Sequence, residues 1–109
     1  MNHRDKIIIE KIVSEINIAA KLMNNVTFTG FDDNEMLKRA VCMTVINIGE
    51  LVKSITDETR ADNKQIPWKE IAGFRDIAAH KYGTLSMESV YQTVMVDFPT
   101  LKEQLQEIN

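Results

Sequence analysis

The sequence predicts an all-α protein, an up-and-down bundle of four to five helices within one domain spanning residues 1–109. Apolar residues recur at helical spacing in several long stretches. Only four glycines and two prolines interrupt the 109 residues, whereas a many-turned β-sandwich needs frequent turn residues. Hydrophobic residues make up 44% of the chain and charged residues 27%, which is the balance of a folded globular domain.

The first helix is expected over residues 4–25. Its apolar side chains recur every three or four residues on one face: Ile9, Ile12, Ile16, Ala19 and Met23. Residues 24–30 break this pattern and predict a loop. Asp32, followed three residues later by Glu35, resembles a capping box, so the second helix is expected to start there.

The second helix is expected to extend to about Thr59. Its middle, residues 40–52, is apolar nearly all round, and such a helix is usually buried. One small domain has too little chain to cover it on every side, so we expect a homodimer. Gly49 should cost about 1 kcal/mol relative to alanine, and its expected use is the close approach of another helix. Glu50 is expected to be a surface carboxylate.

A polar connector, residues 57–65, is expected before a third helix. Pro67 suits the first turn of that helix, because the N–H it lacks would have no partner there. Trp68 is expected to anchor the start of the helix. Its buried face should comprise Ile71, Phe74, Ile77 and Ala78. Gly83 is well placed to stop it.

The fourth helix is expected to begin at Ser86. The segment Asp97-Phe98-Pro99 should either kink this helix or end it, and should open a short last helix that extends to Ile108.

Composition excludes several classes of protein. The single cysteine, Cys42, rules out an internal disulfide framework and a thiolate-cluster zinc site. No window approaches the roughly 18 consecutive apolar residues of a membrane span, and no signal peptide is recognisable, so we expect a cytoplasmic protein. The net charge of −3 argues against a uniformly basic nucleic-acid surface. Residues 60–81, however, carry five basic and three acidic residues and would attract a phosphate-bearing ligand.

The side chains that could carry chemistry gather near His80. Asp76 lies four residues before His80, so its carboxylate can orient the imidazole across one helical turn. On spacing alone, a simple surface contact is the commoner explanation of such a pair. Arg75 and His80 lie about 140° apart around an ideal helix. One copy cannot easily aim both at one atom, whereas two copies related by a two-fold axis could line one cleft with them.

The segment around these residues resembles a known family. Residues 66–82, IPWKEIAGFRDIAAHKY, are similar to the core of HepT-like proteins of the HEPN superfamily. The family pattern is an arginine, a polar residue, three further residues and then His-x-Tyr. It is matched in place by Arg75, Asp76, His80 and Tyr82. The resemblance extends upstream to residues 48–51 and downstream to residues 97–101.

This resemblance implies a metal-independent endoribonuclease toxin that works as a homodimer, with an MNT-type nucleotidyltransferase as its antitoxin partner. RNA supplies the nucleophile, its 2′-hydroxyl, so His80 would act as general acid or base. Arg75 would bind the phosphate and stabilise the transition state. Asp76 would orient His80 or hold a neighbouring polar group. No cofactor is expected, and one cysteine with one plausible histidine offers too few ligands for zinc.

Tyr82 has two interpretations. It could be an amphipathic aromatic residue that packs on the bundle with its hydroxyl in water. In related pairs, a tyrosine at this position accepts AMP from the partner nucleotidyltransferase, and the added bulk and charge would block RNA.

Two other functions stay open. One is a non-catalytic helical partner or nucleotide-binding subunit of a nucleotidyltransferase. The acidic overall charge favours it, because RNA affinity depends largely on phosphate neutralisation. The other is a purely structural dimeric bundle.

Overall fold

The computed structural model describes residues 1–109 and contains helices and no strands, which confirms the all-α prediction. The α-helices are α1 (His3–Leu22), α2 (Phe28–Asp32), α3 (Glu35–Lys53), α4 (Asp57–Asp62), α5 (Trp68–His80), α6 (Met87–Gln92) and α7 (Phe98–Ile108). A 3₁₀ turn, η1 (Tyr82–Thr84), follows α5, and a π-helical turn, η2 (Thr93–Asp97), joins α6 to α7. No helix combines the length and the hydropathy that crossing a membrane requires.

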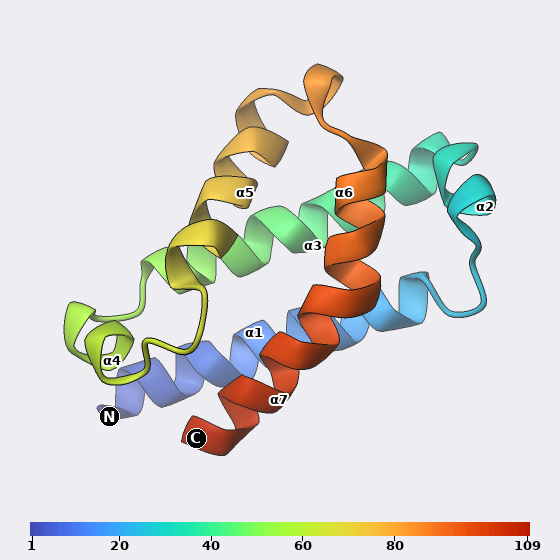
Figure 1. Cartoon of the computed structure of the whole chain (residues 1–109). Coiled ribbons are helices and arrows are strands. Elements are labelled where there is room, and N and C mark those ends of the chain that lie inside the picture. Colours follow the sequence, from blue (N-terminus) through green and yellow to red (C-terminus); the bar gives the residue numbers. More distant parts are fainter.

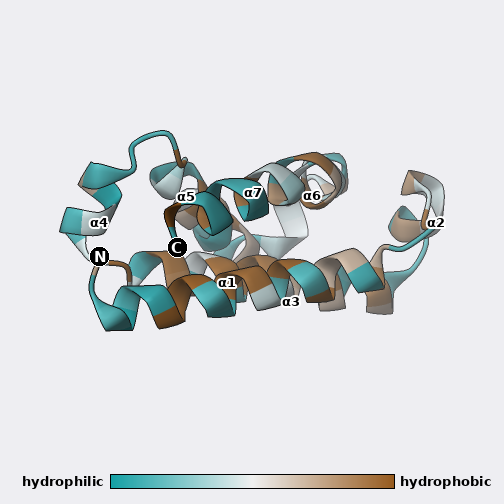
Figure 2. Cartoon of the chain, turned by 90° about the horizontal axis from the view of Figure 1, so that it is seen from below, coloured by the Kyte–Doolittle hydropathy of each residue, from teal (hydrophilic) through white to brown (hydrophobic).

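The helices form two layers. Helices α1 and α3 lie side by side in one layer, and α5 and the α6–η2–α7 segment cover them in the other (Figures 1 and 2). Helix α5 packs along α3, whereas α7 and η2 pack on α1. The two chain termini lie at the same end of the bundle (Figure 1). One cluster of 21 buried residues drawn from all the long helices fills the space between the layers.

Two short helices correct the expected boundaries. Residues 28–32 form α2, which is capped by the Thr27 side chain, in a region predicted as loop and helix start. Asp32 is the last residue of α2, so the predicted capping box with Glu35 is wrong. Asn34 caps α3 instead, because its side-chain oxygen accepts the Leu37 N–H at 3.0 Å.

Helix α3 ends at Lys53, earlier than the expected Thr59. The hydroxyl of Thr56 accepts the Thr59 N–H at 3.3 Å and starts the separate helix α4. The predicted connector over residues 57–65 is therefore partly helical. The cap at Thr56 competes with a longer α3, and the sequence pattern did not show which of the two would form.

The chain itself covers most of the apolar belt of α3. Its members Val41, Val45, Ile48 and Val52 are buried, so the premise that one copy cannot cover residues 40–52 is largely wrong. Met36 and Met43 remain exposed, at 84% and 55%, and Ala40 between them is exposed too.

Helix α5 departs from expectation at both its buried face and its end. Ile77, predicted to be buried, is 44% exposed, whereas Ala78 and Trp68 are buried as predicted. The Trp68 indole N–H donates to the carbonyl of Asn63 at 3.0 Å and anchors the start of the helix. Gly83 lies in η1 without a positive φ, so it is not the predicted helix stop.

The α6–α7 segment begins where expected. Ser86 accepts the Ser89 N–H at 3.2 Å and caps α6. The backbone of Asp97 is helical, so the chain continues into α7 with a π-helical turn instead of a break. Pro99 lies in the first turn of α7, directly after the π-helical turn.

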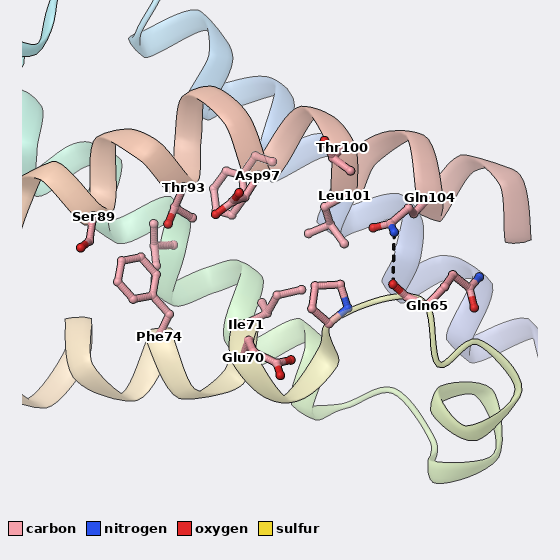
Figure 3. Close-up of a pocket in the computed structure, with 13 residues that line it drawn as sticks. Gln65, Glu70, Ile71, Phe74, Ser89, Thr93, Asp97, Thr100, Leu101 and Gln104 are labelled. Atoms are coloured by element: carbon pink, nitrogen blue, oxygen red, sulfur yellow. Dashed lines mark hydrogen bonds between the residues drawn. The ribbon is translucent and has the colours of Figure 1, made fainter.

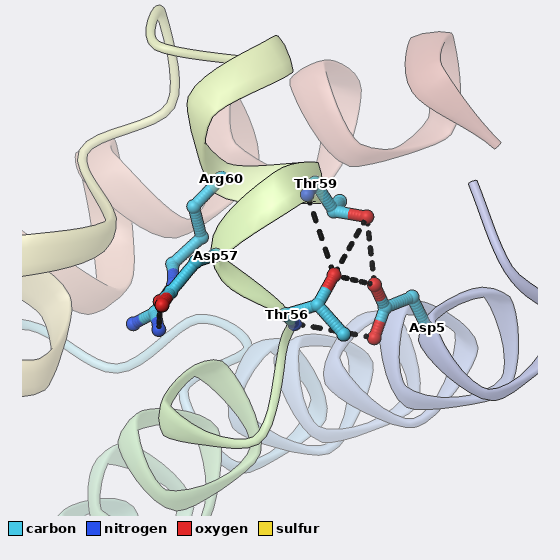
Figure 4. Close-up of polar contacts among 5 residues, drawn as sticks. All are labelled: Asp5, Thr56, Asp57, Thr59 and Arg60. Carbon is cyan, nitrogen blue, oxygen red and sulfur yellow. Dashed lines mark hydrogen bonds and ion pairs between the residues drawn. The ribbon is translucent and has the colours of Figure 1, made fainter.

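A buried carboxylate fastens the first helix to the start of α4. Both oxygens of Asp5 accept hydrogen bonds: from the Thr56 hydroxyl at 2.6 Å, the Thr59 hydroxyl at 2.7 Å and the Thr56 N–H at 3.3 Å (Figure 4). Burial alone would raise the pKa of Asp5, but these hydrogen bonds and nearby Arg4 outweigh it and lower the pKa below its usual value.

Removing this carboxylate should destabilise the fold. We expect Asp5→Ala to lower the free energy of unfolding by about 3 kcal/mol, because buried hydroxyl and N–H groups lose a charged acceptor. Since the pKa of Asp5 is lowered in the folded chain, its contribution to stability is present above about pH 4. This contribution is lost as the pH falls through the folded pKa. Urea unfolding of wild type and variant at neutral and acidic pH checks this. A difference that does not shrink at acidic pH would contradict it.

Candidate active site

Helix α5 approaches α3 closely at Gly49. A Cβ built at Gly49 would overlap the Cβ and Cγ atoms of Arg75. The prediction that Gly49 serves the close approach of another helix is therefore confirmed, and that helix carries Arg75. The stem of Arg75 lies over the glycine, which positions its guanidinium at the α3–α5 seam.

A methyl group at this contact should disturb the seam. Gly49→Ala gains about 1 kcal/mol in helix propensity. However, it meets the base of the Arg75 side chain, so α5 must shift, at a cost of about 2–3 kcal/mol. We expect a net loss of about 1–2 kcal/mol in thermal or urea unfolding. Gly73→Ala is the matched control, because a Cβ there meets nothing within 4 Å and should stabilise the chain by propensity alone.

The Arg75 guanidinium is held by two carboxylates. Its Nη2 forms an ion pair with Glu50, and its Nη1 donates to Asp76 Oδ1 at 3.2 Å. The Arg75 side chain is only 18% exposed, whereas both carboxylates are at the surface. Its Nε is buried without a hydrogen-bond partner. Glu50, expected to be a plain surface carboxylate, is thus a partner of the central cation.

Asp76 also binds a second cation. Lys53 Nζ donates to Asp76 Oδ1 at 2.6 Å across the α3–α5 seam. The hydrogen bond from Lys53, followed by the one from Arg75, lowers the pKa of Asp76, so the carboxylate is ionised at neutral pH. The two cations and two carboxylates form one network with no net charge.

His80 stands apart from this network. It is the last residue of α5, it is exposed, and its side chain makes no hydrogen bond or ion pair within the chain. The expected contact between Asp76 and His80 is not formed, because Asp76 faces Lys53 and Arg75. Of the two predicted roles of Asp76, holding a neighbouring polar group is the one that matches this geometry.

Tyr82 is oriented toward the start of α3. Its hydroxyl donates to Glu35 Oε1 at 3.4 Å, and the Arg39 guanidinium lies 5.1 Å from the centre of its ring. The contacts of the Tyr82 side chain are thus with Glu35 and Arg39 and not with His80. Partial burial and the Glu35 carboxylate raise the pKa of Tyr82. Glu35 in turn pairs with Lys38 at 3.2 Å and with Arg39 at 3.1 Å.

Other reactive groups are absent from this surface. Cys42 is buried, and burial raises its thiol pKa to about 11, so it is not a nucleophile at neutral pH. The structure contains no group of three or more His, Cys, Asp or Glu side chains that could hold a metal ion.

Sequence reasoning missed Lys53 and Arg39. Lys53 lies one turn after Gly49, so the predicted close approach at Gly49 already indicated that a cation on the same face of α3 would meet the incoming helix. No sequence signal tied Arg39 to Tyr82, since that contact depends on the register of α5 along α3.

Several known proteins are similar to this chain over most of its length. The family model described as Ribonuclease HepT-like matches residues 9–108. Putative RNase TTE0752 of Caldanaerobacter subterraneus subsp. tengcongensis is 32% identical over 100 residues, which cover 92% of this chain and 89% of that protein. Probable ribonuclease HepT of Thermococcus cleftensis is 27% identical over 107 residues, which cover 98% and 96% of the two chains.

A third relative, Putative RNase MJ1380 of Methanocaldococcus jannaschii, is 28% identical over 107 residues, covering 97% of this chain and 98% of that protein. No solved structure gives a significant match. The family match covers nearly the whole chain, including helix α5 with Arg75 and His80. The helical fold agrees with this match. The chain therefore belongs to the HepT-like ribonuclease family of the HEPN superfamily.

Proposed function

We propose that this chain is the endoribonuclease toxin of a toxin–antitoxin pair, and that it cleaves RNA without a metal ion at a site shared by two copies. The supporting observation is the arrangement along α5. Arg75 is held in place by Glu50 and Asp76, and the exposed His80 has no partner within the chain. A positioned cation and a free imidazole are the groups that metal-free cleavage of RNA can use, and a second copy of α5 could bring them to one phosphate.

In the proposed reaction, the imidazole of His80 takes the proton of the RNA 2′-hydroxyl. The 2′-oxygen attacks phosphorus, the bond from phosphorus to the 5′-oxygen breaks, and a 2′,3′-cyclic phosphate forms. The leaving 5′-oxygen receives a proton from His80 of the partner subunit, which starts in its protonated form. Arg75 binds the non-bridging oxygens and stabilises the charge that develops on them.

The exposed apolar side chains support a homodimer. Met36 and Met43 on α3 and Ile77 on α5 are left uncovered by the chain. Ile77 lies one turn before His80 on the outer face of α5. A two-fold axis beside Ile77 would bring the two His80 side chains into one cleft.

Disrupting this surface should separate the subunits. We expect the double variant Met43→Glu/Ile77→Glu to weaken dimerisation about a hundredfold or more, because charges replace apolar area on both copies. Light scattering at micromolar concentration should show a dimer for wild type and a monomer for the variant. Val96→Glu is the control, since Val96 is equally exposed but lies in η2, away from this face. A monomeric wild type would refute the shared site.

We further propose that a nucleotidyltransferase partner silences the toxin by transferring AMP to Tyr82. The phenol oxygen would attack the α-phosphorus of ATP, form the Tyr–O–P bond and release pyrophosphate. Because the pKa of Tyr82 is raised, a base of the transferase must take the phenol proton. Arg39 beside the ring and the nearby Lys38 offer cations for the new phosphate.

Cleavage of a defined RNA by the purified chain tests the nuclease proposal. We expect cleavage to persist in EDTA and to leave 2′,3′-cyclic phosphate ends or their hydrolysis products, detectable by mass spectrometry. A preparation of His80→Ala from the same host excludes a contaminating nuclease. Activity that requires added magnesium would refute the metal-free mechanism.

One observation favours a second candidate, a non-catalytic partner subunit of a nucleotidyltransferase. Glu50 and Asp76 already occupy the Arg75 guanidinium, and the chain is acidic overall. An RNA phosphate must displace at least one carboxylate to reach Arg75. If the wild-type chain bound a nucleotidyltransferase but cleaved no RNA in any buffer, this second function would hold.

A further inference from the structure

An open groove separates α5 from the α6–η2–α7 segment. Its volume is about 650 Å³. Figure 3 shows the residues that line it. One wall is a single face of the continuous α6–η2–α7 helix, on which lining residues recur every three or four positions: Ser89, Thr93, Asp97, Thr100 and Gln104. The opposite wall is the face of α5 that carries Glu70, Ile71 and Phe74. Two helices thus form a trough with α3 beneath it.

The floor of this groove is apolar. Val45, Phe98 and Leu101 form its base, and Ile71 and Phe74 of α5 are only half-buried beside them. Helix α5 packs along α3 and makes few contacts with α6 or α7. At one end of the groove the Gln104 side chain donates to the Gln65 carbonyl at 3.2 Å and bridges the two walls (Figure 3). An apolar trough of this size between helices is the kind of place where ligands and helical segments bind.

The negative charge of the groove indicates which kind of ligand it could bind. Glu70 and Asp97 contribute two exposed carboxylates, one from each wall, and no lysine, arginine or histidine lines it. A polyanion such as RNA would be repelled here. A segment that carries apolar side chains flanked by cations would satisfy both the floor and the rim.

The length of the groove suits a helix. From Ser89 to Thr100, short of the Gln104–Gln65 hydrogen bond, the wall rises about 17 Å at 1.5 Å per residue, which a partner helix of about 11 residues would match. We propose that this groove is a docking site for an amphipathic helix of a partner protein, with an apolar stripe flanked by lysine or arginine. The proposal goes beyond the ribonuclease function and does not depend on it.

The position of the groove connects it to the candidate active site. Phe74 faces the groove, and the next residue, Arg75, faces Glu50 across the α3–α5 seam. A helix in the groove would join α5 to α7 and hold the α5 segment that carries Arg75. The partner would thereby act on the site without covering it.

Model peptides test the proposal directly. The probes are two fluorescein-labelled amphipathic helices of about 11 residues with the same leucine stripe, one with lysines and the other with glutamates on the polar face. Fluorescence anisotropy should show binding of the lysine helix and none of the glutamate helix. Glu70→Lys/Asp97→Lys should weaken binding of the lysine helix at least about tenfold, since two attractive pairs become repulsive.

A matched variant separates the groove from general acidity. Glu10→Lys/Glu58→Lys makes the same change in net charge at exposed positions outside the groove and should leave binding within about twofold of wild type. A photoreactive group on the lysine helix should cross-link to peptides from the two groove walls. Circular dichroism confirms that both variants fold.

Four results would overturn the proposal: no binding of the lysine helix, equal binding of the glutamate helix, equal losses in both double variants, or cross-links elsewhere. Light scattering identifies a different occupant, because a change in oligomeric mass on Glu70→Lys/Asp97→Lys would assign the groove to a second copy of this chain. None of these experiments measures RNA cleavage, so a negative result in them would not contradict the proposed ribonuclease function.

Discussion

Replacing His80 by alanine should slow RNA cleavage by about 10²–10⁴-fold, because the variant loses the group that moves protons in the proposed reaction. The fold should not change. His80 is exposed and makes no side-chain hydrogen bond or ion pair within the chain, so the free energy of unfolding should stay within about 0.5 kcal/mol of wild type. Single-turnover cleavage of a defined RNA and thermal unfolding measure the two quantities.

The chain supplies its own control for this experiment. The His3→Ala variant lacks the only other histidine, which is exposed at the start of α1. It should cleave RNA at the wild-type rate. If His80→Ala cleaved RNA within about twofold of wild type, general acid–base catalysis by this residue would be wrong.

Arg75 variants should lose activity as well, but with a structural cost. Arg75→Ala removes the partner of Glu50 and the stem that packs over Gly49, so we expect a loss of about 1 kcal/mol in unfolding free energy. Arg75→Lys keeps the charge but cannot engage Glu50 and Asp76 from a planar group at the same time. If the loss of cleavage activity in the two variants only paralleled their loss of stability, Arg75 would have a packing role and no role in the reaction.

Replacing Tyr82 by phenylalanine should make the chain resistant to a cognate nucleotidyltransferase. With ATP and that enzyme, wild type should gain the mass of AMP on the peptide that contains Tyr82, and RNA cleavage should fall in step. The variant lacks the acceptor oxygen, so it should gain no mass and should stay active. It loses only one long, exposed hydrogen bond to Glu35, at 3.4 Å, so its stability should change by less than about 0.5 kcal/mol.

Tyr91→Phe is the matched control. The Tyr91 hydroxyl donates to the carbonyl of Val26 at 3.2 Å and is partly buried, so this variant should still be modified and silenced through Tyr82. A Tyr82→Phe chain that was stable yet fully neutralised would show that the partner inhibits by covering the site. A strongly destabilised Tyr82→Phe chain would show that the hydroxyl is structural.

Local sequence signals predicted much of the fold correctly. The helical spacing of apolar residues located the four long helical segments, and Ser86 marked the start of α6. The errors occurred where two local signals compete. Asp32 and Asn34 both suit a helix start, and the Thr56 cap interrupts an apolar pattern that would otherwise extend α3. Choosing between such signals depends on which arrangement buries the neighbouring apolar residues, and that is a tertiary property.

The amino-acid sequence was sufficient to identify the helical class and the close approach at Gly49, and it also supplied the candidate site residues Arg75 and His80. Each depends on interactions between neighbours along one helix or on the identity of a residue. The ionic partners of Arg75, the orientation of Tyr82 toward Glu35 and the groove beside Phe74 emerged only from the folded chain. They depend on the register and tilt of α5 against α3, which the packing of the whole core sets and which no short stretch of sequence encodes.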